Sequence, residues 1–586
     1  MDIFSVISFL LGITFFLFGM KVMSGDLEKL AGGRLEALLK KVTKNPLLGL
    51  IVGIAITMAV QSSSAVTVIL VGLVNSGIMQ FAQSVYVIFG ANIGTTITAW
   101  LLSLSGIESD SIVMQMMKPV NFAPILAFIG VIFLMFSKNE KKKSIGTIFI
   151  GFTVLMYGMD FMTDSVDVMV ESYNLSELFV KFSNPLLGVL IGALVTAVIQ
   201  SSSASVGILQ ALAMTGAITY GAAIPIIMGQ NIGTCITALI SAVGTNAKAR
   251  RVAVVHTAIN VIGTLICLTA FEIVDLSFAP ALFDEAAAGW SIAVIHSVFN
   301  ISITVILMPF TKHLARLTEL IVPDKTSTKA PKLIFHPDER LLTSPSIAAN
   351  ECDGYSSKMC ETAKEMLITS FSILCNYDRQ TDEWINMQEE TLDSYEDGLG
   401  TFLVKLSSRS LSEADSKKIT KMLHAIGNFE RLGDHSVNLL KTSREIKEKK
   451  IVFSPEAYEE LTVLTDALIE IITITSNAYI HNDIQKAMRV EPLEQLIDKL
   501  IAVSRKNHVK RMKKGECTFE LGFVFSDILT NCERISDHCS NIAVTIIEAD
   551  NNSFDTHKYL NDVKANDEEF KNLYAEFKSK YSIEKV

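Results

Sequence analysis

Residues 45–65 read NPLLGLIVGIAITMAVQSSSA, and residues 184–204 read NPLLGVLIGALVTAVIQSSSA. The two stretches lie 139 residues apart and are identical at 12 of 21 positions. At the same offset, GANIGTTITA at 90–99 recurs as GQNIGTCITA at 229–238, with 8 of 10 positions identical. Two apolar stretches share Leu and Val by chance, but they do not share a fixed register of Gln, Ser, Asn, Thr and Pro. The pattern therefore indicates an internal duplication.

The composition indicates that part of this 586-residue chain lies in a membrane. Hydrophobic residues make up 49% and charged residues 19%, below the ~25% of charged residues in soluble domains. Residues 1–322 contain 17 basic and 17 acidic residues, so the net charge of −10 lies in residues 323–586. This acidic half argues against nucleic-acid binding, which needs a cationic surface. Apolar stretches long enough to span or enter a bilayer lie at 3–20, 46–75, 81–104, 119–137, 145–162, 185–215, 217–243, 252–272 and 290–311.

The distribution of Lys and Arg between the loops predicts the topology. A signal peptide at 3–20 is not favoured, because no basic residue precedes it and no small-residue cleavage site follows it. The positive-inside rule is satisfied only if 46–75 and 185–215 enter and leave on one side, as re-entrant hairpins. The N-terminus then lies outside, and everything after residue 312 is cytoplasmic. The loops that decide this orientation are 21–45, 138–144 and 244–251.

This topology inverts the two repeats, about 1–138 and 139–312, with respect to each other. Inverted repeats with interrupted helices near the midplane are the architecture of secondary transporters. We expect QSSSA, in the middle of each hairpin, and NIGT, inside an apolar span, to interrupt helices. The eight cysteines contain no CxxC pair, which indicates free thiols rather than disulfides or a zinc site.

The duplicated motifs supply neutral oxygen atoms. A Na⁺ ion that sheds its water needs such ligands, and helix N-termini at the hairpin tips bind anions through N–H groups. No Lys or Arg lies deep inside a span, so co-bound Na⁺ would compensate an anionic substrate. Helix packing is the alternative role of a lone Ser or Thr, but the duplicated blocks favour a site. His256 and His296, each with Asn four residues later, stay open between a function and a tie between helices.

These doubled motifs resemble the type II sodium–phosphate cotransporter family over about residues 1–312. In that family the paired QSSS motifs form the substrate and Na⁺ site, which implies phosphate and Na⁺ as ligands here. The resemblance does not settle the direction of transport. Carried over motif by motif, the implied binding residues are Gln61, Ser62, Ser63, Ser64, Asn92, Thr95, Gln200, Ser201, Ser202, Ser203, Asn231 and Thr234.

The second half has the apolar periodicity of a helical domain. A proline-rich linker is expected at 323–349, followed by six helices within about 350–550 and a helical tail at 551–586. NFERLGDH at 428–435 recurs as NCERISDH at 531–538, so the order is three helices, then three more. Acidic residues four apart share a helix face and are able to bind a metal. Spacing alone favours a solvated face whose carboxylates pair with arginine.

The duplicated E-R-x-x-D-H-x-x-N pattern resembles the PhoU family over about residues 350–550. That family regulates phosphate transport and carries metal-binding E/DxxxD motifs. A two-metal hydrolase using His435 and His538 is less favoured, because each repeat offers one His beside an Asp, and adjacent residues do not share a helix face. The resemblance implies a divalent or transition metal at Glu430, Asp434, Glu533 and Asp537, with Asp393, Asp397, Glu494 and Asp498 as weaker candidates.

We therefore expect an all-α, polytopic membrane protein of two inverted repeats with re-entrant hairpins, carrying a cytoplasmic helical domain of two three-helix repeats. Residues 1–322 would form the transport domain of the cell membrane. The expected function is Na⁺-coupled transport of phosphate by alternating access, regulated by the helical domain, without enzymatic activity. The alternatives are an exporter without a strict need for Na⁺ and a membrane-tethered phosphate sensor. The expected partners are phosphate, Na⁺ and the lipid bilayer, without nucleic acid; a homo-oligomer stays open.

Overall fold

The computed structural model describes residues 3–40, 45–77, 79–106, 116, 118–173, 184–278, 280–323, 337–409, 411–551 and 568–583. These residues are helical almost throughout, and their only β pairing is a single bridge between Thr219 and Ala286. They fall into two compact units. The first comprises Met1–Thr328 with Asp338–Ile347, and the second comprises Lys329–Pro337 with Ala348–Val586. The predicted all-helical fold is confirmed.

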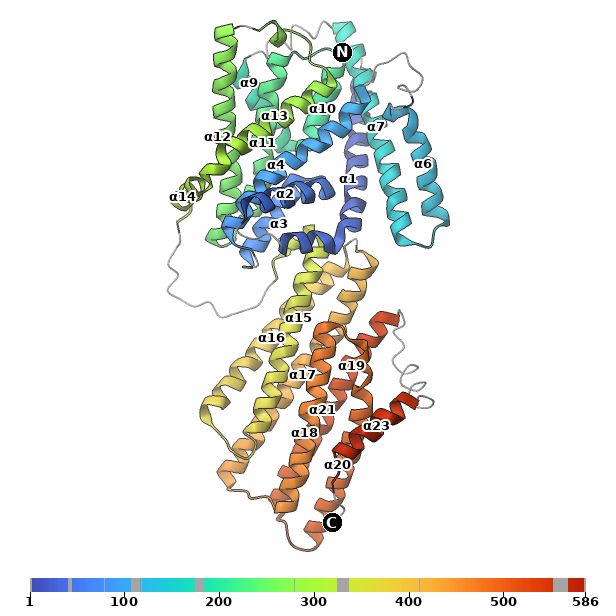
Figure 1. Cartoon of the computed structure of the whole chain (residues 1–586), viewed down its shortest axis with the longest axis vertical. Coiled ribbons are helices and arrows are strands. Elements are labelled where there is room, and N and C mark those ends of the chain that lie inside the picture. The colour runs from blue at the N-terminus through green and yellow to red at the C-terminus, as the bar shows by residue number, and fades with distance from the viewer. Residues whose placement is uncertain are drawn as a thin grey trace. The chain divides into compact units, whose positions relative to one another are not determined.

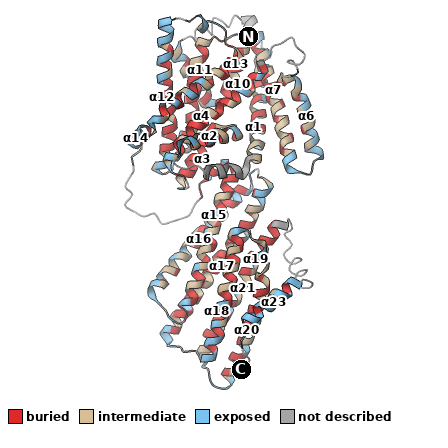
Figure 2. Cartoon of the chain, in the orientation of Figure 1, coloured by how far each residue is buried: buried red, intermediate tan, exposed pale blue. Residues whose placement is uncertain are grey.

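Most of the long apolar helices belong to the first unit, whose helices α1 to α14 are labelled in Figure 1. Among the described helices, eight are long and apolar enough to cross a membrane, and seven of these belong to this unit. Figure 2 shows that α6 is exposed along much of its length, whereas α4, α10 and α11 are mostly buried. The long helices of this unit are α1 (Ile3–Lys40), α4 (Phe81–Ser103), α6 (Pro119–Phe136), α7 (Glu140–Tyr173), α11 (Tyr220–Ser241), α12 (Ala247–Phe278) and α13 (Gly289–Leu307), which continues into α14 (Thr311–Ile321).

Each predicted hairpin consists of two short helices with a break between them. At ~1.5 Å per residue, helices of 13 or 15 residues reach only ~20–22 Å, less than the ~30 Å hydrocarbon core. Neither arm therefore spans a bilayer by itself. The arms are α2 (Pro46–Val60) and α3 (Ser63–Asn75) in the first repeat, and α9 (Pro185–Ile199) and α10 (Ser202–Met214) in the second.

Glycines bring the first arm of each hairpin against the NIGT helix of the same repeat. A Cβ atom on Gly53 of α2 would lie 2.2 Å from the Val87 carbonyl oxygen of α4. In the second repeat, a Cβ atom on Gly192 of α9 would lie 2.1 Å from the Ile226 carbonyl oxygen of α11. Backbone contact at this distance is a property of small residues in membrane helix pairs. The two repeats thus share their architecture as well as their sequence.

The repeats also meet through their first helices. α1 packs along α7, its counterpart in the second repeat. Gly19 and Gly158 are 139 residues apart in sequence, and a Cβ atom on either would lie within 2.4 Å of backbone nitrogen on the opposite helix. Phe16, which is fully buried beside this contact, reaches Gly207 of α10. The QSSS helix of the second repeat is therefore packed against the first helix of the other repeat.

The second unit is a helical bundle whose chain order confirms the predicted succession of three helices and then three more. The first of them, α15, starts at Pro345, within the linker predicted at 323–349, because the apolar periodicity extends back to Ile347, Ala348 and Ala349, which are buried. The short helix α19 precedes α20, in whose first turn Pro492 lies. The helices are α15 (Pro345–Ser372), α16 (Arg379–Ser407), α17 (Glu413–Lys449), α18 (Pro455–His481), α19 (Ile484–Met488), α20 (Val490–Lys513), α21 (Phe519–Asn551) and α23 (Glu568–Lys580).

The eighth helix of membrane-spanning length is α18, and it belongs to this second bundle. It packs against α20 and α21. Leu464, Leu468 and Ile471 are fully buried there, and Glu460 forms a buried ion pair with Arg511 of α20. Its apolar character is thus explained by its position in the core of the bundle. We do not assign it to the membrane.

Candidate functional site

Both QSSS motifs break the hairpin in the same way. Gln61 lies in the left-handed region at φ 55°, ψ 25°, and Gln200 at φ 58°, ψ 23°. Each main-chain N–H donates to a threonine carbonyl four residues earlier, at 2.7 Å in both repeats. Left-handed backbone is strained for a residue other than glycine and is concentrated at functional sites. Its occurrence at corresponding positions of both repeats supports the prediction that the hairpins carry the site.

The residue after each glutamine restarts the helix. Ser62 Oγ accepts a hydrogen bond from the Ala65 N–H, and Ser201 Oγ accepts one from the Ala204 N–H, each at 3.2 Å. These two serines are therefore N-caps. The following serines occupy the first turn of α3 and α10, where N–H groups and the positive end of the helix dipole favour an anion. They are buried, with exposed fractions between 4% and 7%, and comprise Ser63, Ser64, Ser202 and Ser203.

The two halves of the site are interleaved. α3, which begins at the first QSSS, contacts α11, which carries the second NIGT motif. α10, which begins at the second QSSS, contacts α4, which carries the first. Each QSSS helix thus lies against the NIGT helix of the opposite repeat. Relative movement of the repeats would change both contacts together.

The expectation that NIGT interrupts its helix is wrong. α4 and α11 run as continuous helices through both motifs. The glycines of these motifs serve close packing instead: a Cβ atom on Gly94 would lie 2.8 Å from Thr57 Cβ, and one on Gly233 would lie 2.7 Å from Thr196 Cβ. Composition alone does not distinguish a glycine that breaks a helix from one that admits a neighbour.

The polar NIGT side chains bond mainly to backbone. Thr95 and Thr234 donate to the carbonyl four residues earlier, at 3.0 and 2.9 Å. Asn231 donates in the same way to the Ile227 carbonyl at 3.1 Å, whereas Asn92 donates to Oδ1 of Asn260 on α12 at 3.2 Å. All four predicted residues are buried. The donated hydrogens leave hydroxyl and amide oxygen lone pairs that are suited to a cation.

Two residues that the sequence analysis did not select lie beside the breaks. Thr57 and Thr196 are 1% and 0% exposed, and the hydroxyl oxygen of each lacks a hydrogen-bond partner among the described residues. They occupy the last turns of α2 and α9, at the repeat offset of 139. A buried hydroxyl without a partner is costly. The sequence does carry a sign of these two residues, because a threonine occupies the same position in both repeats.

Gln210 is a further buried polar residue that the sequence analysis missed. It lies on α10 and is fully buried. Its Nε2 donates to the Ala99 carbonyl of α4 at 2.9 Å and to the Gly289 carbonyl of α13 at 3.1 Å. Its contacts tie the second QSSS helix to the first NIGT helix. A lone Gln in an apolar run gave no repeat signal.

His256 and His296 are both buried in the first unit, at 1% exposure. The asparagine four residues after each donates to the histidine's backbone carbonyl, at 3.0 Å for Asn260 and 2.9 Å for Asn300. The His-x-x-x-Asn spacing therefore reflects back-bonding within a helix. It does not decide between the two roles left open for the imidazoles.

The predicted metal ligands lie on α17 and α21 of the second unit. Glu430 and Asp434 share one face, and burial together with the neighbouring Asp434 raises the pKa of Glu430 to about 7. Burial and the Asp434 carboxylate also raise the pKa of Asp393 on α16. Mutual repulsion of this kind is relieved by a cation. Arg431 is a weak competitor, since its nitrogens lie 3.6 Å from Glu430 and 4.0 Å from Asp434 at an exposed position.

The negative charges of the corresponding carboxylates on α21 are more fully balanced by neighbouring arginines. Glu533 accepts a 2.6 Å hydrogen bond from Arg505, and Asp537 lies 3.6 Å from Arg534. Burial raises the pKa of Asp537. Within the described part of the chain, no three His, Cys, Asp or Glu side chains are arranged to hold a metal ion. The donor chemistry thus fits a hard cation best at the first cluster, whereas the side-chain arrangement does not yet form a coordination sphere.

The repeated histidines join the two halves of this unit. His435 Nδ1 lies 2.9 Å from Oδ1 of Asn531, and His538 Nδ1 lies 3.0 Å from Oδ1 of Asn428. Each Asn donates its Nδ2 to a backbone carbonyl four residues earlier, so the oxygen faces the ring and Nδ1 carries the proton. These reciprocal bonds explain why N and H recur together in the motif. They assign the histidines to packing between repeats.

Comparison with known proteins groups the two units with separate families. Residues 15–164 and 166–278 match the family model described as Na⁺/Pi-cotransporter, and residues 356–442 and 461–546 match the PhoU domain.

Among curated proteins, the chain is 21% identical over 552 residues to the "Putative inorganic phosphate export protein YjbB" of Escherichia coli strain K12, covering 93% of this chain and 98% of that protein. It is 30% identical over 322 residues to the uncharacterized protein YqeW of Bacillus subtilis strain 168, covering 55% of this chain and 99% of that protein. A shorter match of 37% over 153 residues, covering 23% of this chain and 22% of the other protein, is to the human sodium-dependent phosphate transport protein 2B.

Proposed function

Because the chain belongs to the Na⁺/Pi-cotransporter family and also carries a PhoU domain, we propose that it moves inorganic phosphate with Na⁺ across the cell membrane by alternating access. The observation that supports this most directly is the matched pair of strained breaks at Gln61 and Gln200. Each break starts a helix, α3 or α10, that contacts the NIGT helix of the other repeat. We place substrate binding between these two breaks, and we propose no enzymatic activity.

In this proposal the first-turn N–H groups and serine hydroxyls of α3 and α10 hold the phosphate oxygens. Neutral oxygens hold Na⁺. The hydroxyls of Thr57 and Thr196, which have no partner within the described ranges, are the best placed to join them. Phosphate binding would then depend on Na⁺, because the bound cation supplies the positive charge that the site lacks. The second unit would sense the phosphate or metal state of the cytoplasm and regulate the cycle.

Export without a strict need for Na⁺ is the second candidate. It is supported by the relative in Escherichia coli, which covers 93% of this chain and is named for phosphate export. The sodium-dependent relative in humans covers only 23% of the chain, but the QSSS and NIGT motifs of both repeats carry neutral oxygens suited to Na⁺. We rank Na⁺-coupled transport first because of these oxygen ligands.

Flux of ³²P-phosphate in proteoliposomes, under an inward gradient of Na⁺ or choline, tests the two candidates. The first predicts flux that requires Na⁺ and is lost in Gln61→Ala and in Gln200→Ala, with Gln380→Ala on the exposed surface of the second unit as the matched control. Flux of equal rate in choline would favour the exporter. A chain without flux in either salt would contradict both candidates.

We further propose that the carboxylate cluster of Glu430, Asp434 and Asp393 binds a divalent cation. Its support is the raised pKa of Glu430 and of Asp393, since a cation would relieve the repulsion that raises them. The full chain, stripped with chelator and then titrated with Mn²⁺ in a calorimeter, should bind the ion. Asp434→Asn should lose that binding, whereas the exposed Glu383→Gln should keep it. Equal binding by Asp434→Asn would exclude this cluster.

A further inference from the structure

A short segment of the chain forms a strap on the first unit. We define the strap as Asp338–Ser344, which includes the short helix η5 (Glu339–Thr343). It belongs to the first unit, yet it leads directly into α15, whose residues from Ala348 onward belong to the second. Leu341 of the strap is fully buried. It lies on α3, where a Cβ atom on Gly72 would be 3.0 Å from Leu341 Cδ2.

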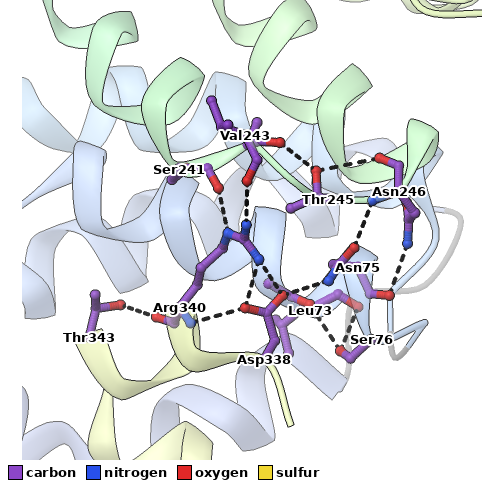
Figure 3. Close-up of polar contacts among 12 residues, drawn as sticks. Leu73, Asn75, Ser76, Ser241, Val243, Thr245, Asn246, Asp338, Arg340 and Thr343 are labelled. Atoms are coloured by element: carbon purple, nitrogen blue, oxygen red, sulfur yellow. Dashed lines mark hydrogen bonds and ion pairs between the residues drawn. The ribbon is translucent and has the colours of Figure 1, made fainter. Parts of the chain in front are cut away.

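The strap also holds the end of α11 through one arginine (Figure 3). Arg340 donates Nε to the Ser241 carbonyl and Nη2 to the Val243 carbonyl, the latter at 2.8 Å. These carbonyls lie at the C-terminal end of α11, where a cation is favoured by the helix dipole. Asp338 orients the guanidinium, because its two carboxylate oxygens accept from Nη1 at 3.0 and 3.1 Å.

Asp338 extends the same network to the first repeat. Asn75, the last residue of α3, donates Nδ2 to Asp338 Oδ2 at 2.8 Å. Asn75 also accepts two hydrogen bonds from Asn246. The Asn246 N–H donates to Asn75 Oδ1 and the Asn246 Nδ2 donates to the Asn75 carbonyl oxygen, each at 2.9 Å. Figure 3 shows these bonds as one continuous network. The end of α3 is therefore joined directly to the segment that follows α11, and the strap adds a second link from α3 to the end of α11 itself.

The other hairpin has a comparable contact that is built differently. In the second repeat, the connection from α10 to α11 bonds to the segment before α13: Ala287 N–H donates to the Ile218 carbonyl at 2.7 Å, and Tyr220 N–H donates to the Glu285 carbonyl at 3.0 Å. That contact lies wholly within the first unit. The connection from α3 to α4 is instead held by the segment that enters the second unit. Of these two contacts, the strap contact is the one made by a segment that continues into the second unit.

We propose that the strap is a regulatory brace, and this inference rests on the proposed transport function. When docked, it holds the end of α3 to the end of α11 and slows the relative movement of the repeats that alternating access requires. A rearrangement of the second unit that pulls on α15 would withdraw Arg340 from α11. The brace would then open and transport would accelerate. The ligand-dependent state of the second unit thereby sets the population of the braced form.

The brace is tested first by distance, independently of transport. Spin labels at Ser76→Cys and Val243→Cys mark the ends of α3 and α11, in a full chain whose more accessible native thiols Cys267, Cys375 and Cys517 are replaced by Ser. In nanodiscs, Arg340→Ala should broaden the distance distribution and shift it to longer values, and Arg340→Lys should do so less. Arg316→Ala, on an exposed face of α14, is the charge-matched control. A distribution unchanged by Arg340→Ala would overturn the brace.

Flux in proteoliposomes then tests the regulatory role. Arg340→Ala should raise the rate of phosphate flux by about fivefold, and Asp338→Asn should raise it in the same direction, because it removes the orienting carboxylate. Unchanged or slower flux in both variants, with a longer label distance, would overturn the regulatory role. Absence of flux in every form, including the native chain, would contradict the proposed function, while the distance measurement would still decide whether the brace exists. If Arg340→Ala fails to insert, Arg340→Lys and Asp338→Asn carry the same comparison.

Discussion

The hydroxyl of Thr98 donates a 2.8 Å hydrogen bond to Oε1 of Gln61, which joins the NIGT helix α4 to the helix break of the same repeat. The second repeat has the same pair of residues, Thr237 and Gln200. There, Thr237 Oγ1 is buried without a partner in the described part of the chain, and Gln200 is exposed. One sequence pattern thus adopts two states within one molecule. Inverted repeats that exchange such states provide a basis for alternating access.

The first prediction concerns this bond. Thr98→Val should reduce the rate of phosphate flux by about tenfold, because the Gln61 side chain loses the group that orients it. Thr98→Ser keeps the hydroxyl and should retain most of the flux. The measurement is initial ³²P uptake in proteoliposomes at matched protein content. Native flux in Thr98→Val would show that the bond has no part in the transport cycle.

The second prediction concerns the unpartnered threonines. Thr57→Val removes a buried hydroxyl that has no hydrogen-bond partner among the described residues, so the protein should become more stable by up to about 1 kcal/mol. If the oxygen is a Na⁺ ligand, the same change should also lower the affinity for Na⁺, so that half-maximal flux requires an about tenfold higher Na⁺ concentration. Thr196→Val should behave alike. Thermal unfolding and the Na⁺ dependence of flux are measured on the same preparation. A loss of stability together with unchanged Na⁺ dependence would assign both hydroxyls to packing.

The third prediction concerns the close contact of α2 with α4. Gly53→Ala places a Cβ atom 2.2 Å from the Val87 carbonyl oxygen, so the helices must separate, and the protein should lose several degrees or more of thermal stability. Gly25→Ala is the matched control in α1, because a Cβ atom there meets nothing within 4 Å. It should be neutral or mildly stabilising. Fluorescence-detected thermal unfolding in detergent compares the two. Equal melting temperatures would mean that α2 and α4 accommodate the added Cβ atom without loss of stability.

Much of the fold follows from the sequence because duplication supplies the comparison that a single sequence otherwise lacks. The breaks at Gln61 and Gln200 are predicted because polar residues recur at a fixed offset inside apolar runs. The uninterrupted helices through NIGT are not, because Gly94 and Gly233 make contact with residues about 40 positions earlier. Glycine weakens a helix locally, but packing against a neighbour outweighs that preference.

The candidate site shows the same division. Thr57 and Thr196 were missed because a Thr in an apolar run usually bonds to its own helix. The structure shows that the hydroxyls of these two have no partner in the part of the chain that it describes. The strap was missed because its region is rich in proline and charge, which favours a linker. Arg340 finds its partners about a hundred residues away, at Ser241 and Val243. Local composition carries no information about such contacts.

The fourth prediction is a pH dependence in the second unit. The Arg444 guanidinium, with the Tyr377 hydroxyl, holds the pKa of Asp382 below its usual range. A depressed pKa means that the stabilisation is fully present above the ordinary Asp pKa of ~3.9 and is lost as the pH falls through the lower folded value. Hydrogen exchange in α16 of the full chain, measured as the pH is lowered, should become faster at acid pH as this stabilisation is lost. Asp382→Asn should remove that part of the pH dependence and cost about 1 kcal/mol at neutral pH. An unaltered acid profile would contradict this assignment.

The fifth prediction concerns the buried ion pair between Glu460 and Arg511, which are 3% and 4% exposed. Arg511 donates Nη1 and Nη2 to the two carboxylate oxygens at 2.8 and 3.1 Å, and Asn507 donates to Oε1 at 3.0 Å. Glu460→Ala leaves a buried guanidinium without its counter-charge and should destabilise the second unit by about 3–5 kcal/mol.

The matched control is Glu383→Ala, which breaks an exposed pair with Arg379 and should change stability by less than about 0.5 kcal/mol. Hydrogen exchange in α18 and α20 of the full chain measures both variants, because the lost stability should appear as faster exchange in these two helices. Glu460→Gln keeps the shape and one acceptor, so it should lie between the other two. Exchange in Glu460→Ala as slow as in the native chain would mean that water reaches Arg511 and that the pair contributes little.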